Sequence, residues 1–206
     1  MATELATKLA TEYLGTELDD ATLVACVLRG QSAAFGALYE RHADRVYRYL
    51  RFRVHDEATA RDLTQDVFVA VLHALPNLRQ DGLFDHWLMR IAHNRLVNHW
   101  RSTARESTFL DIDAAEDDQA DEPVPAFVLA DPEEPEPRVE RRLTWDALRI
   151  ETSALSALQQ EVLALRFAGG CSVHETAEIL GRSEAAVKKL QLRALAKLRQ
   201  RLRVLE

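Results

Sequence analysis

Five polar residues recur at helical spacing in one stretch of the chain: Arg90, Asn94, Asn98, Arg101 and Arg105. Steps of four, four, three and four residues place them on one face of a helix, opposite an apolar stripe. Guanidinium and amide groups can hydrogen-bond the free edges of unpaired nucleic-acid bases, and the neighbouring Trp87 could stack on such bases. An ordinary amphipathic helix with a solvated polar side is the alternative, and spacing alone leaves both interpretations open.

A second candidate surface for nucleic acid lies near the C-terminus. Residues 173–192 fit a helix-turn-helix template, with Ala177 where the two helices would cross and Gly181 at the turn. Ser172 and Ser183 can cap the two helices. The second helix would offer side chains suited to phosphates and base edges in a major groove, and a helical hairpin with a solvated basic face is the alternative. These side chains are Arg182, Ser183, Glu184, Lys188, Lys189, Gln191 and Arg193.

Acidic side chains gather on a predicted helix over residues 58–75, where Asp62 and Asp66 lie one turn apart. Acid–base catalysis would need a partly buried pair of carboxylates, and the flanking sequence gives no sign of such a site. We therefore interpret this helix as having an acidic face that is solvated or faces a partner. Its inward positions are predicted to be Leu63, Val67, Phe68, Val71 and Leu72.

The sequence contains no recognisable constellation for catalysis or for a metal. Four histidines lie on the predicted helices: His73, His86, His93 and His99. None has a second histidine at a ligand spacing with a supporting acid. Phosphate-binding glycine loops, nucleophile elbows and zinc signatures are also missing from the sequence. We predict no enzyme, no cofactor and no metal, and we expect Cys26 and Cys171 to be inert thiols.

The elements that must position these residues are helices. The 206 residues include only seven Gly and six Pro, too few for a turn-rich β protein, and Leu, Ala, Arg and Glu dominate. No segment has the period of a strand, so the fold class is predicted to be all-α. No apolar run approaches the roughly 20 residues of a membrane span, and Met1 to Leu18 does not resemble a signal peptide. We therefore expect a cytoplasmic protein without membrane insertion.

The net charge of −7 is concentrated in one segment, residues 106–140, which holds thirteen acids, one base and five of the six prolines. High like charge together with proline opposes both helix and core formation, so we predict an acidic flexible linker. The chain then divides into an N-terminal tail at 1–18, a helical domain at 19–105, the linker, and a basic helical domain at 141–206. A charge asymmetry of this kind is typical of a nucleic-acid binder with an acidic insert.

These segments together resemble bacterial RNA polymerase sigma factors of the extracytoplasmic-function (ECF) class of the sigma-70 family. The resemblance rests on Asp62–Phe68, on Phe84–Arg101, and on Leu158–Leu198 with its helix-turn-helix. It implies a sigma region 2-like bundle followed by a sigma region 4-like helix-turn-helix domain. It further implies that the chain binds core RNA polymerase and directs promoter-specific transcription initiation.

The resemblance also assigns partners and residues. The polymerase β′ clamp and β flap, promoter DNA and an anti-sigma factor are the implied partners. The loop Asn77 to Leu83 would capture a flipped base. Asn98 stands where the family usually has Asp, and Ala185-Ala186 replaces Gly-Thr. The implied polymerase-binding residues are Asp62, Leu63, Gln65, Asp66 and Phe68. Those that bind and melt the −10 element are Trp87, Arg90, Asn94, Asn98 and Arg101. Those that bind the −35 element are Arg182, Ser183, Glu184, Lys188, Lys189, Gln191 and Arg193.

A different class of protein remains as the alternative. A helix-turn-helix transcriptional regulator would bind duplex DNA by itself, without acting as a sigma factor. Such a regulator is expected to dimerise on palindromic sites. A sigma factor alone is expected to bind promoters poorly, because its acidic linker repels DNA and its two small domains make few phosphate contacts.

Overall fold

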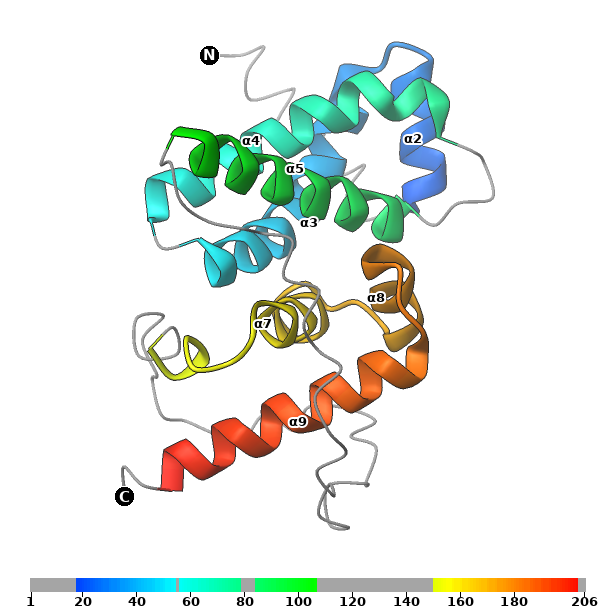
Figure 1. Ribbon diagram of the computed structural model, residues 1–206. Coiled ribbons are helices and arrows are strands. Elements are labelled where there is room, and N and C mark those ends of the chain that lie inside the picture. The colour runs from blue at the N-terminus through cyan, green and yellow to red at the C-terminus, as the bar shows by residue number, and fades with distance from the viewer. Residues whose placement is uncertain (1–17, 55, 79–83, 107–149, 204–206) are drawn as a thin grey trace.

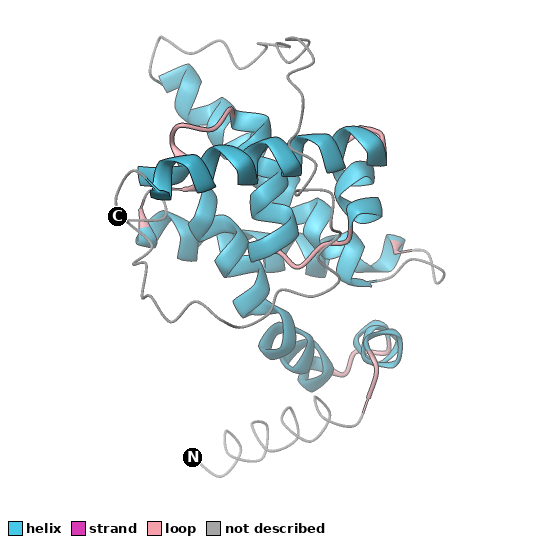
Figure 2. Cartoon of the chain, turned by 90° about the horizontal axis from the view of Figure 1, so that it is seen from below, coloured by secondary structure: helices cyan, strands magenta, loops and turns pink. Residues whose placement is uncertain are grey.

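The computed structural model describes four stretches of the chain: residues 18–54, 56–78, 84–106 and 150–203. Within these stretches every regular element is a helix, which confirms the all-α prediction (Figure 2). The predicted N-terminal tail up to residue 17, nearly all of the predicted linker and most of the loop before residue 84 lie outside them. No helix in the described part of the chain is long and apolar enough to cross a membrane.

Four α-helices form what we call the N-terminal module: α2 (Asp20–Leu28), α3 (Ser32–Arg53), α4 (Glu57–Ala74) and α5 (Phe84–Glu106). A 3₁₀ turn, η1 (Leu75–Asn77), follows α4, because Pro76 cannot continue an α-helix. The Asp19 carboxylate caps α2 by accepting a hydrogen bond from the Thr22 amide at 2.8 Å. Asp56 caps α4 in the same way, through the Thr59 amide at 2.7 Å.

The core of this module lies around α3, which packs against α2, α4 and α5 (Figure 1). The apolar side chains that form this core recur at helical spacing and are buried, so hydrophobic burial orients the bundle. Leu38, Val46 and Leu50 come from α3 itself, while Leu88 and Leu96 project from α5.

The C-terminal module contains α7 (Ala157–Leu163), α8 (Val173–Leu180) and α9 (Glu184–Arg203). Two capping boxes form, one between Ser156 and Gln159 and the other between Ser172, whose capping role was predicted, and Glu175. The helix opened by Ser156 changes at Ala164 into a π-helical turn, η3 (Ala164–Ala168), before the two glycines that follow.

The two modules lie directly against each other (Figure 1). Helix α3 contacts η3, and the start of α5 contacts α8. Leu165 and Cys171 of the C-terminal module are buried in the same apolar cluster as the core around α3. The approach is close at Gly169, where an added Cβ would lie 2.8 Å from the Met89 methyl carbon. The sequence predicts two domains joined by a flexible linker, and its local patterns do not indicate this contact.

Candidate nucleic-acid interface

The predicted polar face of α5 is exposed at the four positions whose side chains the structure describes, and the Arg105 side chain lies outside the described part. The buried residues Leu88, Ala92 and Leu96 hold the opposite side of the helix in the core. Trp87 is only half-buried and packs against Phe84, with ring centroids 6.0 Å apart. The side chains of Arg90, Asn94, Asn98 and Arg101 all point away from the core into solvent. One continuous surface of guanidinium and amide groups therefore lies beside a partly accessible indole.

The helix-turn-helix has the predicted turn. Gly181 ends α8 with φ of +62° and ψ of +37°, the left-handed conformation that favours glycine. Thr176 stands where an apolar residue is usual in the template, and it is fully buried. Its hydroxyl donates to the Ser172 carbonyl at 2.8 Å, which satisfies the polar group inside the core.

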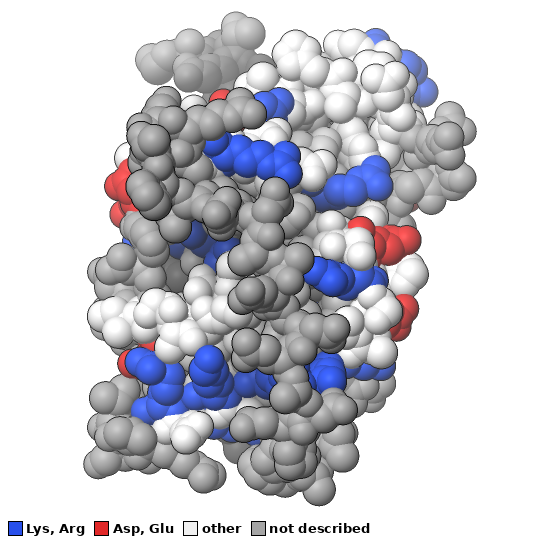
Figure 3. All heavy atoms as spheres, in the orientation of Figure 1, with Lys and Arg blue, Asp and Glu red and all other residues white. Residues whose placement is uncertain are grey.

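Helix α9 is anchored by apolar residues on one side and exposes its first turns on the other. Val187 and Ala194 are fully buried, and the Ser183 hydroxyl caps the helix by accepting from the Ala186 amide at 3.2 Å. Arg193 is half-buried. The side chains exposed on this end are Arg182, Ser183, Glu184, Lys188 and Lys189. Lys and Arg side chains gather along the α9 edge of the molecule (Figure 3).

Gln191 was predicted to be exposed on this surface, and that prediction is wrong. Its side chain is only 7% exposed. The Gln191 amide oxygen accepts a hydrogen bond from Arg166 Nε at 3.0 Å, and Arg166 also donates to the Cys171 carbonyl. Gln191 therefore fixes α9 against the turn between η3 and α8.

The exposed face of α4 carries both acidic and apolar groups. Asp62, Gln65 and Asp66 are exposed, whereas Leu63 and Phe68 are buried and hold the helix in the bundle. Two further residues belong to this exposed face. Leu72 was expected to point inward but is 47% exposed, and Val69, which the sequence analysis did not single out, is 55% exposed. Positions 62, 65, 66, 69 and 72 share one side of a helix, and this periodicity could have revealed both residues.

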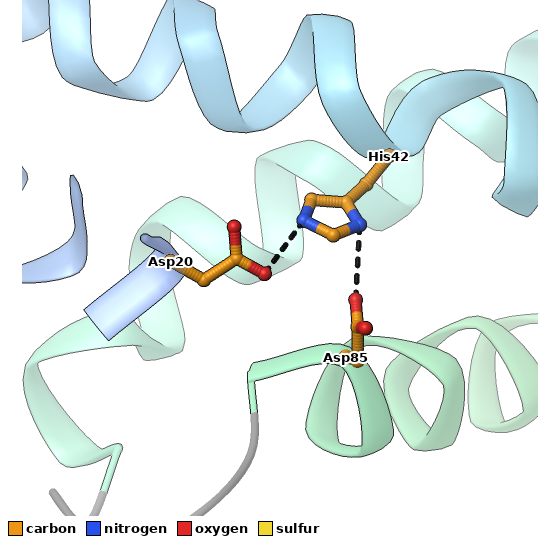
Figure 4. A group of neighbouring side chains, drawn as sticks. All are labelled: Asp20, His42 and Asp85. Carbon is orange, nitrogen blue, oxygen red and sulfur yellow. Dashed lines mark hydrogen bonds and ion pairs between the residues drawn. The ribbon is translucent and has the colours of Figure 1, made fainter. Parts of the chain in front are cut away.

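An ionic cluster joins α2, α3 and α5 (Figure 4). His42 Nε2 lies 2.9 Å from Asp20 Oδ2, and His42 Nδ1 lies 3.0 Å from Asp85 Oδ1. Arg41 pairs with Asp20, and Arg45 pairs with Asp85 at 3.1 Å. The contact from His42 and the charge of Arg45 lower the pKa of Asp85 despite its partial burial. Both ring nitrogens face carboxylates that are already paired with guanidinium groups, so the cluster stabilises the bundle and is a poor cation site.

Residues 38–106 match sigma-70 region 2, and residues 153–200 match sigma-70 region 4. The chain is 31% identical to RNA polymerase sigma factor YlaC of Bacillus subtilis over 163 residues, which are 79% of this chain and 88% of YlaC. The chain therefore belongs to the RNA polymerase sigma factors of the sigma-70 family, with regions 2 and 4.

Two further comparisons refine the family. The chain is 36% identical over 170 residues to the ECF RNA polymerase sigma factor BldN of Streptomyces coelicolor. That match covers 81% of this chain and spans 59% of BldN. The solved structure of CnrH in complex with the cytosolic domain of CnrY superposes with a TM-score of 0.64 at 27% identity. The superposition covers 90% of this chain and 97% of CnrH. The sigma factor is thus of the ECF class.

Proposed function

We propose that this sigma factor binds core RNA polymerase and directs it to promoters whose −35 element is read by α9 and whose −10 element is opened on α5. The observation that carries the proposal is the exposure of two nucleic-acid-type surfaces on separate modules. One is the amide and guanidinium face of α5, and the other is the basic first part of α9.

Helix α5 would hold the separated strand of the −10 element. Opening a duplex costs a few kcal/mol for each unstacked step, and capturing a base on an aromatic side chain returns about 1–3 kcal/mol. Trp87 offers such a side chain at the edge of the face. Arg90, Asn94 and Asn98 can hydrogen-bond to base edges and backbone. No covalent step by sigma is required, since the polymerase performs the chemistry.

Helix α9 would enter the major groove of the −35 element. Arg182 and Lys188 are exposed and can contact phosphates, which position a helix in the groove. Glu184 and Lys189 stand on the first turns, from which recognition helices reach base edges. Gln191 is left out of this set because its amide oxygen is already bound by Arg166.

Helix α4 would dock on the polymerase. Its exposed face combines the carboxylates of Asp62 and Asp66 with the apolar side chains of Val69 and Leu72. A mixed face of this kind gives a partner both apolar area to bury and charges that fix orientation. The buried Leu63 and Phe68 would support the face from beneath.

The test is transcription with purified core polymerase that lacks sigma, a library of promoter sequences and the full chain. We expect initiation from a defined subset of promoters, and poor binding of duplex promoter DNA by the chain alone. The proposal fails if no promoter-specific initiation occurs while the chain by itself binds palindromic duplexes, since that result identifies an ordinary regulator.

We also propose that an anti-sigma protein regulates the chain by covering α4 and the basic end of α9. The similar protein CnrH was solved in complex with the cytosolic domain of CnrY, and both faces are exposed here. Affinity purification from native cells under different stresses should recover a protein that competes with core polymerase. Recovery of polymerase alone under every condition would contradict this part.

A further inference from the structure

A buried ionic network connects the two modules. Its centre is the Glu161 side chain on α7, which is 5% exposed. One carboxylate oxygen accepts a hydrogen bond from the Tyr49 hydroxyl and lies 3.0 Å from His93 Nδ1. The other oxygen accepts from Arg53 Nε at 2.8 Å. Both oxygens of a buried carboxylate are thereby satisfied.

Every partner of this carboxylate belongs to the opposite module. Tyr49 and Arg53 lie on α3, and His93 lies on α5. The same Arg53 also donates to the Gln160 side chain at 2.6 Å and stacks over the Trp100 ring at 4.7 Å. Glu161 is thus paired only while the modules are in contact, and the fold of its own module does not use its charge.

Such a network stabilises the contact and still permits it to open. Removing one member of a buried ion pair leaves an unpaired charge in a dry site, which is strongly unfavourable. Separating the modules exposes both members to water, so no charge is left stranded. The ionic network around Glu161 therefore stabilises one arrangement of the two modules and still allows the modules to separate.

A second contact shows what the closed arrangement does to the proposed DNA surfaces. The Glu178 carboxylate on α8 lies 3.2 Å from His86 Nε2 at the start of α5. Glu178 also pairs with His174 at 3.7 Å, and His174 pairs with Glu184, the first residue of α9, at 3.0 Å. Two side chains, Glu178 and His174, thus connect the beginning of the α5 surface with the beginning of the α9 surface.

The two promoter elements are much farther apart than this. Elements centred near −10 and −35 are separated by about 25 base pairs, or about 85 Å of B-form duplex. Two surfaces whose ends are joined through only two side chains cannot contact both elements at once. The arrangement of the modules seen here must therefore change before the chain can bridge a promoter.

We propose that Glu161 is an intramolecular latch that holds the free sigma factor closed, by docking α7 onto Tyr49, Arg53 and His93 of the other module. The need for opening rests on the proposed function, whereas the latch itself concerns only the isolated chain. The partner of this interaction surface is the N-terminal module of the same polypeptide.

The native cysteines report opening directly. Cys171 is 1% exposed and lies against the N-terminal module, with Arg45 Nη2 4.0 Å from its sulfur. Cys26 is 7% exposed inside the N-terminal module, so module separation leaves it covered. Alkylation of the full chain by N-ethylmaleimide, followed by mass spectrometry of each cysteine peptide, measures both rates in one sample.

The test compares wild type with Glu161→Gln, which keeps the size of the side chain and removes its charge. We expect Cys171 to be alkylated about tenfold faster in the variant, which corresponds to about 1.4 kcal/mol, while Cys26 is unchanged. The matched control is Glu151→Gln, because Glu151 pairs with Arg201 at 3.0 Å within the C-terminal module. This control should leave Cys171 at the wild-type rate.

Three results would overturn the latch. Equal Cys171 rates in wild type and Glu161→Gln would mean that Glu161 does not hold the contact. Parallel acceleration of Cys26 and Cys171 would mean that Glu161 supports the fold rather than the contact. An equal acceleration of Cys171 alkylation in Glu151→Gln would mean that removing any carboxylate charge from this module exposes Cys171, whichever contacts that carboxylate makes. Since no polymerase or DNA is present, a failed transcription test leaves the latch standing, and a failed alkylation test leaves the proposed function standing.

Discussion

The exposed apolar pair on α4 allows a sharp test of polymerase docking. Val69 and Leu72 are 55% and 47% exposed, so neither contributes its full apolar area to the bundle. We propose replacing both with serine. Because about half of each side chain is already in water, the double variant should retain its fold and lose affinity for the polymerase.

The size of the effect follows from the exposed area. Complete burial of a Val or Leu side chain contributes about 1.5–3 kcal/mol, so the exposed half can contribute about 1 kcal/mol at an interface. The two residues together give about 2 kcal/mol. At about 1.4 kcal/mol per tenfold, the dissociation constant of the complex should rise about 30-fold.

The assay is titration of fluorescently labelled full chain with core polymerase, monitored by anisotropy. The matched control is Leu28→Ser, because Leu28 is 53% exposed on α2, outside the α4 face. The reasoning is refuted if the Val69→Ser, Leu72→Ser double variant binds as tightly as the Leu28→Ser control. It is also refuted if the double variant melts well below wild type, since these side chains would then belong to the core.

Three other perturbations have definite expected outcomes. Gly181→Ala should lower the free energy of unfolding by about 1–2 kcal/mol in denaturant titrations, because φ is +62° there, and an unchanged midpoint would contradict this. Burial alone raises the pKa of Glu161, but the hydrogen bond from His93 and the charge of Arg53 hold it below its usual value. Its stabilising effect is therefore present above the unfolded pKa and lost as pH falls through the lowered folded value. The melting temperatures of wild type and Glu161→Gln should differ at about pH 7, and the difference should shrink as the pH falls below about 4, so a constant difference would count against the assignment. Lys188→Ala should reduce initiation from a matched promoter severalfold at unchanged melting temperature, whereas Lys197→Ala, exposed farther along α9, should not.

The parts of the fold that could be predicted from sequence depend on neighbours a few residues away. Capping by Ser156 and Ser172 needs a partner only three positions later. The turn at Gly181 is a property of one residue's backbone. Apolar periodicity likewise predicted the exposed faces of α5 and α9, because burying one side of a helix leaves the other side in water.

Only the tertiary structure decided which side chains meet across the two modules. Glu161 and Tyr49 are 112 positions apart, and nothing in the spacing of either residue indicates that they share a hydrogen bond. Gln191 has the polarity of an exposed residue, yet Arg166 of another helix draws it into the core. The sequence alone therefore determined the helices, their caps and the family resemblance. The closed arrangement and its latch depend on long-range packing, which local spacing does not encode.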